Sequence, residues 1–160
     1  MDEAIRTKLL ESEAGKPVLD ALTALLAQDA YLLRVDANER SVVHRFALHL
    51  QAQLPKLHVD CEYNRDGVDP KRIQHLYLNP DSEDTEAKTV FPDVIAHSRD
   101  SKDNYLVIEL KKTTNTVSRE VDFAKLRGYK GNLKYHFALF IELAAGEGKA
   151  GVSRVEWIDG

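Results

Sequence analysis

Residues 91–112 read FPDVIAHSRDSKDNYLVIELKK, and this stretch decides the fold. It contains two apolar runs of strand length, FPDVIAHS and NYLVIELKK, separated by a polar, turn-like segment at 99–103. The arrangement predicts an antiparallel hairpin. Asp93 on the first strand is then expected to lie close to Glu109 on the second, across the sheet.

The second strand of this hairpin carries a polar face. Side chains alternate along a strand, so Glu109 and Lys111 point to one face while the apolar residues between them point to the other. Mg²⁺ prefers oxygen ligands and keeps several waters, so Asp93, Glu109 and a main-chain carbonyl, taken as that of Leu110, would hold it. The metal would activate water and neutralise a phosphate, and Lys111 would orient the water or stabilise the transition state. The pattern predicts hydrolysis of a phosphodiester.

A helix of about fifteen residues is predicted to begin after Asn38, a good N-cap. Apolar residues recur along it at spacings of three and four until Pro55: Val43, Phe46, Leu50 and Leu54. At ~100° per residue, Glu39 projects within about 40° of Val43, which places a carboxylate on the apolar stripe. Such a charge needs a partner.

Further elements flank these segments. Helices are predicted over 3–11 and 17–29, the second opened by Pro17, and strands over 57–63 and, more weakly, 75–78. After the hairpin come a helix over 118–133, which Gly128 and Gly131 are expected to end or bend early, a strand over 136–143 and a final edge strand over 152–158. The order α, α, α, β, β, β, α, β, β predicts an α/β fold.

These residues together resemble the motif of the PD-(D/E)XK nuclease superfamily. Pro92-Asp93 is followed, sixteen positions after Asp93, by Glu109-Leu110-Lys111, and Glu39 matches the acidic residue that many members carry on the preceding helix. The resemblance covers roughly residues 38–143. It implies a restriction-endonuclease-like core with a central mixed β-sheet flanked by helices, to which the N-terminal helices are an extension.

The resemblance also implies roles for individual residues. Asp93 and Glu109 would be metal ligands, Lys111 the catalytic lysine, and Glu39 a further metal or water ligand. Lys125 and Tyr129, four apart on the following helix, are similar to the glutamine and tyrosine that RecB-like members place beside the active site. Lysine in place of glutamine is a departure from that pattern, and it puts the role of the pair in doubt.

The function implied is that of an endonuclease that cleaves DNA, in preference to RNA, with Mg²⁺ as cofactor and Mn²⁺ as its substitute. Lys125 and Tyr129 are expected to contact nucleic acid, as are Lys112 and Thr113 through ammonium, hydroxyl and main-chain N–H groups. A homodimer is expected if both strands of a duplex are cut. The alternative is an inactive nuclease-like fold that binds nucleic acid or a protein partner. An acidic mimic of DNA is disfavoured, because charges of both signs are interspersed.

Plainer interpretations exist for each of these residues. Glu39 is also what a helix start favours, because a negative charge there interacts with the helix dipole. Asp93 also fits a turn or surface acid, and Glu109 with Lys111 also fits an exposed charge pattern, although VIEL is very apolar for a solvated strand. Residues 111–114 also fit an ordinary solvated strand end.

Composition limits the remaining possibilities. A chain of 160 residues with 43% hydrophobic content predicts one domain, divided into a helical extension (1–36), the core (38–143) and a C-terminal edge strand (144–160). The net charge is −4, yet residues 102–134 hold eight basic and four acidic residues, a local balance of +4 near the candidate site.

Cysteine and histidine usage argue against other kinds of site. Cys61 is the only cysteine, which excludes an intrachain disulfide and a thiolate-rich zinc site. His44 and His49 are five apart, so they do not stack on one helix face as a zinc pair would. The charged first residues and the lack of a long apolar run predict a cytoplasmic protein that is not in a membrane.

Overall fold

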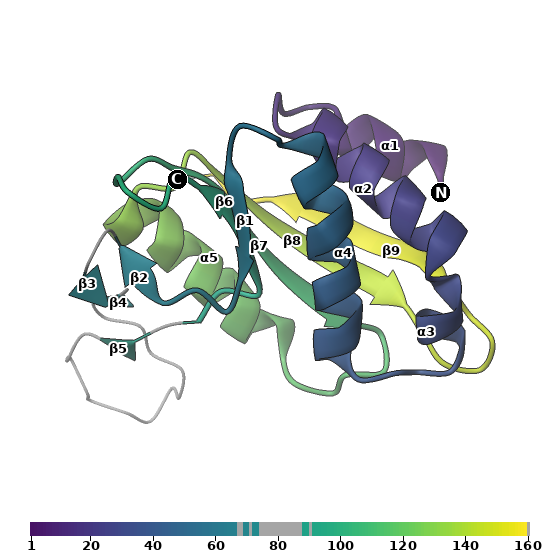
Figure 1. Ribbon diagram of the computed structural model, residues 1–160. Helices are drawn as coiled ribbons and strands as arrows, with labels where there is room; N and C mark the ends of the chain where they lie inside the picture. Colours follow the sequence, from purple (N-terminus) through teal and green to yellow (C-terminus); the bar gives the residue numbers. More distant parts are fainter. Residues whose placement is uncertain (67–68, 71, 74–87, 90, 160) are drawn as a thin grey trace.

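A five-stranded mixed sheet flanked by helices forms the centre of the computed structural model, which describes residues 1–66, 69–70, 72–73, 88–89 and 91–159 (Figure 1). The strand order is β1-β6-β7-β8-β9. β7 pairs antiparallel with β6 and parallel with β8. The strands span His58–Cys61 (β1), Val94–His97 (β6), Asn104–Lys112 (β7), Phe137–Ala144 (β8) and Gly151–Trp157 (β9). The α/β class expected from the sequence is confirmed.

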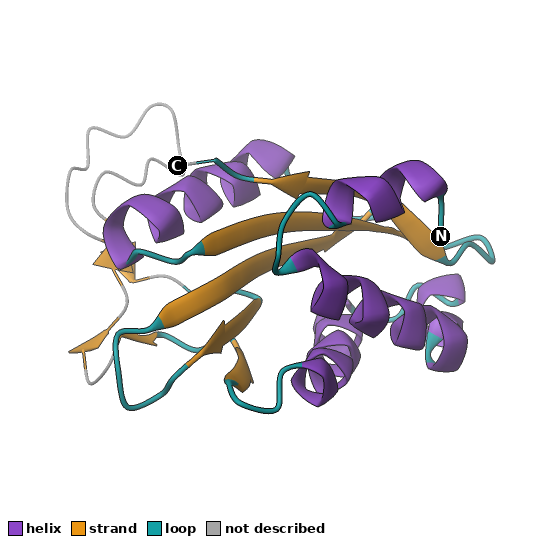
Figure 2. Ribbon diagram, turned by 90° about the horizontal axis from the view of Figure 1, so that it is seen from above, coloured by secondary structure: helices purple, strands orange, loops and turns teal. Residues whose placement is uncertain are grey.

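Helices cover both faces of the sheet (Figure 2). α2 and α4 lie on one face and α5 on the other, while α1 packs against the edge strand β9. The helices span Glu3–Leu9 (α1), Gly15–Gln28 (α2), Ala30–Arg34 (α3), Glu39–Gln53 (α4) and Arg119–Leu133 (α5). Two pairs of short strands stand apart from the sheet: Arg65–Asp66 (β2) with Asp69–Pro70 (β3), and Arg72–Ile73 (β4) with Lys88–Thr89 (β5).

The central strand β7 has helices over both of its faces, which explains its apolar sequence. Leu106, Ile108 and Leu110 belong to the core shared with α2 and α4, whereas Val107 belongs to the core shared with α5. The alternation predicted for this strand is therefore confirmed. Glu109 continues the row of Val107 and lies on the α5 side of the sheet.

The predicted hairpin is confirmed as β6 and β7. Val94 pairs with Ile108 in this register, and the next step along both strands places Asp93 opposite Glu109. Asp93 directly precedes β6, so its position is set by the sheet rather than by a free loop. The juxtaposition expected from cross-strand pairing is present.

Two helix boundaries differ from expectation. α5 continues through Gly128 and Gly131 to Leu133, because Leu126, Tyr129 and Leu133 pack on the sheet and this packing outweighs the low helix propensity of glycine. α2 begins at Gly15, two residues before Pro17. A Cβ at Gly15 would stand 1.7 Å from the carbonyl oxygen of Leu9, so only glycine allows this close approach to α1.

The start of α4 agrees with the sequence prediction. Asn38 is the N-cap of α4, and its side chain accepts a hydrogen bond from the amide of Ser41 at 2.8 Å. The short helix α3 was not expected, and the strand predicted at 75–78 lies outside the described residues. None of the described helices combines the length and the apolar character needed to cross a membrane.

Candidate functional site

Asp93, which is half-buried directly before β6, and Glu109, which is buried on β7, form a pair of carboxylates. Oδ2 of Asp93 accepts a hydrogen bond from the main-chain amide of Leu110 at 2.8 Å. Burial raises the pKa of Asp93 to about 6, although the Leu110 hydrogen bond and the charge of Lys125 act against this shift. Burial, followed by the charge of Asp93, raises the pKa of Glu109 well above its usual value. The ionised form of each acid is therefore disfavoured in the fold unless a cation stands beside it.

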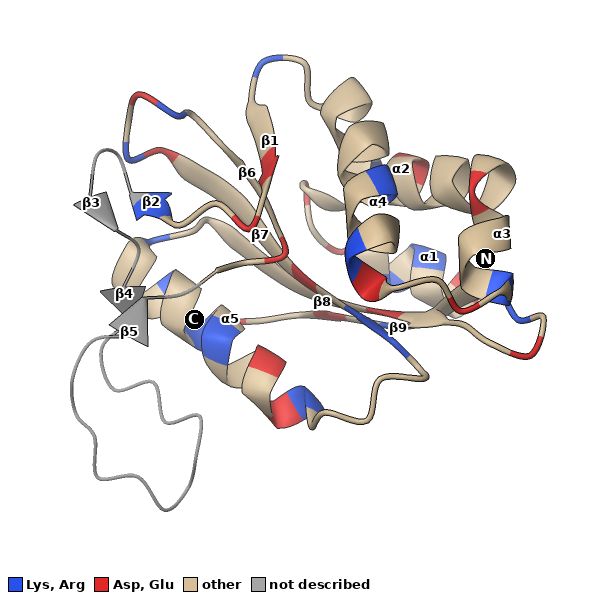
Figure 3. Cartoon of the chain, turned by 60° about the horizontal axis from the view of Figure 1, so that its bottom comes forward, with Lys and Arg blue, Asp and Glu red and all other residues tan. Residues whose placement is uncertain are grey.

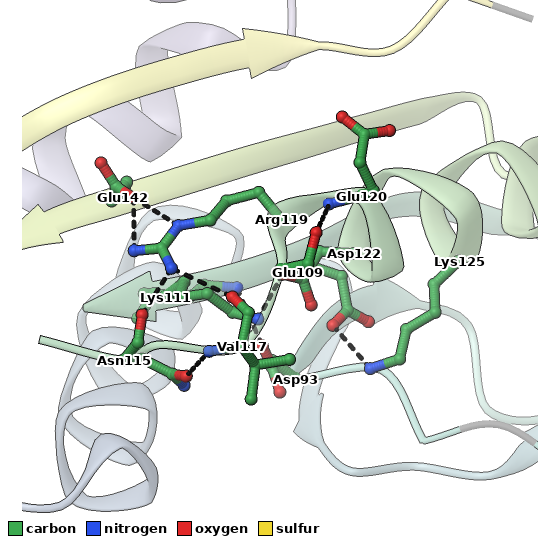
Figure 4. A network of polar contacts seen from close by, with 12 residues as sticks. Asp93, Glu109, Lys111, Asn115, Val117, Arg119, Glu120, Asp122, Lys125 and Glu142 are labelled. Atoms are coloured by element: carbon green, nitrogen blue, oxygen red, sulfur yellow. Dashed lines mark hydrogen bonds and ion pairs between the residues drawn. The ribbon is translucent and has the colours of Figure 1, made fainter. Parts of the chain in front are cut away.

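Glu109 is 1% exposed, and its two oxygens have different surroundings. Oε2 accepts a hydrogen bond from Nζ of Lys125 on α5 at 3.1 Å (Figure 4). Oε1 accepts no hydrogen bond of good geometry from any described residue, although the hydroxyl of Tyr129 lies near the carboxylate. An ionised oxygen left in this state is costly, which marks a place where a positively charged ligand would be stabilised.

Lys111 lies on the same face of β7 as Glu109, as the alternation predicts. Its ammonium forms an ion pair with Oδ2 of Asp122 on α5. The side chains of Lys111 and Asp122 are 7% and 6% exposed, so the pair is almost fully removed from solvent. Asp122 thereby fixes the ammonium beside the two acids.

Glu39 connects the start of α4 to the end of β7. Its Oε2 accepts a hydrogen bond from the amide of Lys112 at 2.9 Å, and both of its oxygens lie 3.1 Å from Nδ2 of Asn115. The partner that the sequence required for this carboxylate is therefore present. Glu39 also stands in the first turn of α4, so the plainer interpretation, a favourable charge at a helix start, holds at the same time.

Lys112 and Thr113 are engaged within the fold. Nζ of Lys112 lies 2.6 Å from Oδ1 of Asp36 and also donates to the carbonyl of Ala37. The hydroxyl of Thr113 accepts a hydrogen bond from the amide of Ala145. Contact of these two residues with nucleic acid stays a prediction, and so does the carbonyl of Leu110 as a metal ligand.

Two residues of the network were missed from the sequence, Asp122 and Arg119. Asp122 heads the buried stripe of α5, followed by Leu126, Tyr129 and Leu133 at helical spacing, and an acid on such a stripe is the signal that identifies it. Arg119 binds Glu142 at 2.8 Å and donates to main-chain carbonyls of the segment that joins β7 to α5. It holds that connection in place.

A pocket of about 200 Å³ leads to Asp93 from the α4 side. It is lined by Glu39, Arg40, Val43, Cys61, Glu62 and Asp93. Arg40 and Glu62 form an ion pair at 3.1 Å across its lining. In Figure 3, acidic segments of the sheet lie between α4 and α5, with basic segments of α5 beside them.

The donor set fits a magnesium ion better than a zinc ion. Within the described part of the chain, no three His, Cys, Asp or Glu side chains converge as a metal-binding group. Mg²⁺ does not require such a cage, because it is commonly held by one or two carboxylates together with waters and substrate phosphates. Nε2 of His49 lies 2.7 Å from Oδ2 of Asp29.

Comparisons with family models, with curated proteins and with solved structures give no match. A functional proposal for this chain therefore depends on its own residues and their geometry.

Proposed function

We propose that the chain is a metal-dependent nuclease with a restriction-endonuclease-like core over residues 38–143, in which Asp93 and Glu109 hold a Mg²⁺ ion. The observation that supports this most directly is the pair of acids itself. Asp93, directly before β6, lies opposite Glu109 on β7, and one oxygen of Glu109 is left without a hydrogen bond of good geometry from the described residues. A divalent cation would balance the excess negative charge.

The protein supplies a rigid frame for these groups. Leu110 holds Asp93 by a main-chain hydrogen bond, and Glu109 stands on a strand paired on both sides. Asp122 keeps the ammonium of Lys111 beside them, where it can orient water or offset charge on a phosphate. When bound, the metal ion would lower the pKa of a water molecule and neutralise phosphate charge. Mn²⁺ would substitute, because it also prefers oxygen ligands.

The topology agrees with this class of enzyme. When the short strands β2–β5, which lie outside the five-stranded sheet, are left aside, the elements α4, β1, β6, β7, α5 and β8 have the order α, β, β, β, α, β, which is that of the core that the sequence motif resembles. Glu39 comes from α4, Glu109 and Lys111 come from β7, and Asp93 is the residue that precedes β6. Glu39 is proposed as a further metal or water ligand on the Asp93 side.

A nucleic-acid substrate is proposed because of the local balance of +4 over residues 102–134 in a chain of net charge −4, and DNA is preferred to RNA because of the resemblance of the motif alone. Lys125 and Tyr129 lie on the helix beside the site.

One site cuts one strand, so cleavage of both strands would need a homodimer. A cytoplasmic location is proposed because Cys61, the only cysteine, fits a reducing compartment.

Cleavage assays on purified protein test the proposal. Circular duplex, linear duplex and single-stranded DNA and RNA are each incubated with Mg²⁺ or Mn²⁺, with Ca²⁺ as a control for binding without cleavage. Asp93→Asn and Glu109→Gln are expected to lower the rate about 100-fold or more. Glu120→Gln is the matched control, because Glu120 is exposed on α5 and its carboxylate points away from the site (Figure 4). Absence of cleavage with every substrate and metal would contradict the proposal.

A second candidate, a nuclease-like fold that binds nucleic acid or a protein without cleaving, is favoured by one observation. The ammonium groups of Lys111 and Lys125 are both paired with acids of the site itself. The same assays separate the two candidates. Retention of labelled DNA without cleavage, equal in Mg²⁺ and Ca²⁺, would identify the binding fold.

A further inference from the structure

Lys125 is the cation that Glu109 contacts in this structure. Its Nζ lies 3.1 Å from Oε2 of Glu109, and its side chain is 24% exposed, against 1% for Glu109. Lys111, the other lysine of the site, is 7% exposed and is paired with Asp122. Of these two ammonium groups, that of Lys125 has the wider access to solvent.

The charges around Lys125 are not balanced. Asp93, Glu109 and Asp122 contribute three carboxylates, and Lys111 and Lys125 contribute two ammonium groups. Lys125 interacts electrostatically with all three acids. Its ammonium therefore stands where positive charge is needed most, which is also where a divalent cation would be attracted.

We infer that the ammonium of Lys125, on Oε2 of Glu109, offsets the charge of this carboxylate in the metal-free protein and is displaced when the metal binds. This inference rests on the proposed metal site at Asp93 and Glu109. The two oxygens of one carboxylate are close together, so a divalent cation at Oε1 of Glu109 and the ammonium on Oε2 would repel each other strongly. The flexible four-carbon stem of lysine allows the ammonium to move while α5 stays in place.

Displacement of Lys125 would regulate the affinity of the site for metal. The ammonium stabilises the empty site and lowers its affinity for metal, because the metal must break the Lys125–Glu109 ion pair before it binds. The released ammonium moves toward solvent, where it becomes available to a phosphate group of the substrate. Metal binding and substrate contact are thereby coupled through one side chain.

Calorimetric titration of MgCl₂ and MnCl₂ into wild type, Lys125→Met and Arg127→Gln tests the inference. Arg127 is exposed on the same helix, so its variant loses one positive charge without touching the site. The titration is run at about pH 8.5, because the pKa values of Asp93 and Glu109 are raised and protons would compete with the metal ion at lower pH. Lys125→Met is expected to bind metal about tenfold more tightly or better, as removal of a like charge within ~4–6 Å predicts. Arg127→Gln is expected to match wild type.

Acylation of lysines in the folded wild type, followed by mass spectrometry, gives a second measurement that needs no variant. Mg²⁺ is expected to raise the rate at Lys125 several-fold and to leave the exposed Lys149 unchanged. Equal or weaker metal binding by Lys125→Met, or protection of Lys125 by Mg²⁺, would overturn the inference and leave the metal site standing. Failure of both wild type and Lys125→Met to bind metal would overturn the proposed function and the inference with it.

Discussion

The main-chain amide of Leu110 donates a hydrogen bond of 2.8 Å to the carboxylate of Asp93. The donor belongs to the middle residue of the Glu109-Leu110-Lys111 triplet, so the first acid of the motif is tied to the strand that carries the second. This contact keeps two like charges together although they repel each other. The two acids are thus held close together by the fold itself.

The pH dependence of stability follows from Asp93. Burial raises its pKa from 3.8 to about 6, so between these values the folded protein holds a proton that the unfolded chain has lost. The free energy of unfolding of the metal-free protein is therefore expected to fall as pH rises through this range. Glu109, whose pKa is also raised, extends the decline to higher pH. Urea denaturation at a series of pH values measures how the free energy of unfolding changes with pH.

Asp93→Asn isolates the contribution of this residue. Asparagine keeps an oxygen that accepts the Leu110 hydrogen bond but carries no charge. At pH 8 the metal-free variant is expected to be more stable than wild type by about 1–3 kcal/mol, from ~1.4 kcal/mol per unit of pKa shift. If the free energy of unfolding depends on pH with the same slope in wild type and Asp93→Asn, burial of the ionised Asp93 carboxylate does not destabilise the fold.

Lys111 and Asp122 are expected to depend on each other. Lys111→Met leaves the buried carboxylate of Asp122 without its partner, which costs about 3–5 kcal/mol. The double variant Lys111→Met/Asp122→Leu is expected to be more stable than the sum of the single changes predicts, by at least about 1 kcal/mol. The exposed pair Lys16–Asp20 is the control, and Lys16→Met is expected to cost about 0.5 kcal/mol or less. Additive losses at Lys111 and Asp122 would contradict the pairing.

Glu39 allows its structural and chemical roles to be separated. Glu39→Ala removes the acceptor of the Lys112 amide and is expected to cost about 1–3 kcal/mol, whereas Glu39→Gln keeps one oxygen and costs less. If Glu39 also binds the metal or its water, Glu39→Gln strongly lowers the rate of cleavage while the free energy of unfolding changes little. Thermal denaturation and cleavage rate, measured together, decide between the roles. Equal cleavage by wild type and Glu39→Gln would leave Glu39 a purely structural residue.

Bound metal is expected to stabilise the protein through the acids that hold it. At a Mg²⁺ concentration of about 100 times Kd, the free energy of unfolding rises by about 2.7 kcal/mol. Glu109→Gln is expected to lose this increase, while Glu120→Gln keeps it. Thermal shift with and without MgCl₂ measures the difference. An equal Mg²⁺ effect in both variants would place the metal elsewhere.

The parts predicted from the sequence depend on local patterns. Asn38 marked the start of α4, and alternation along β7 placed Glu109 and Lys111 on one face. The proximity of Asp93 and Glu109 followed from hairpin pairing, because sixteen positions separate them and a tight turn joins their strands. Such short-range rules fix neighbours within one supersecondary unit.

The parts that were missed depend on long-range packing. The pairing of Lys112 with Asp36 joins residues 76 positions apart, and no local pattern indicates it. The ammonium of Lys112 lies against Asp36 and Ala37 because α4 and the segment before it pack against the end of β7, and its contact with nucleic acid stays a prediction. The predicted bounds of α5 were close to those observed, and only the early end or bend expected at its glycines was wrong, since burial on the sheet outweighs two glycines.

Diffraction from crystals soaked in MnCl₂, recorded at the manganese absorption edge, tests the metal site most directly. The account predicts an anomalous peak beside the carboxylates of Asp93 and Glu109, with the ammonium of Lys125 withdrawn from Glu109. A peak bound to other residues, or none in crystals of protein that cleaves DNA with Mn²⁺, would contradict it.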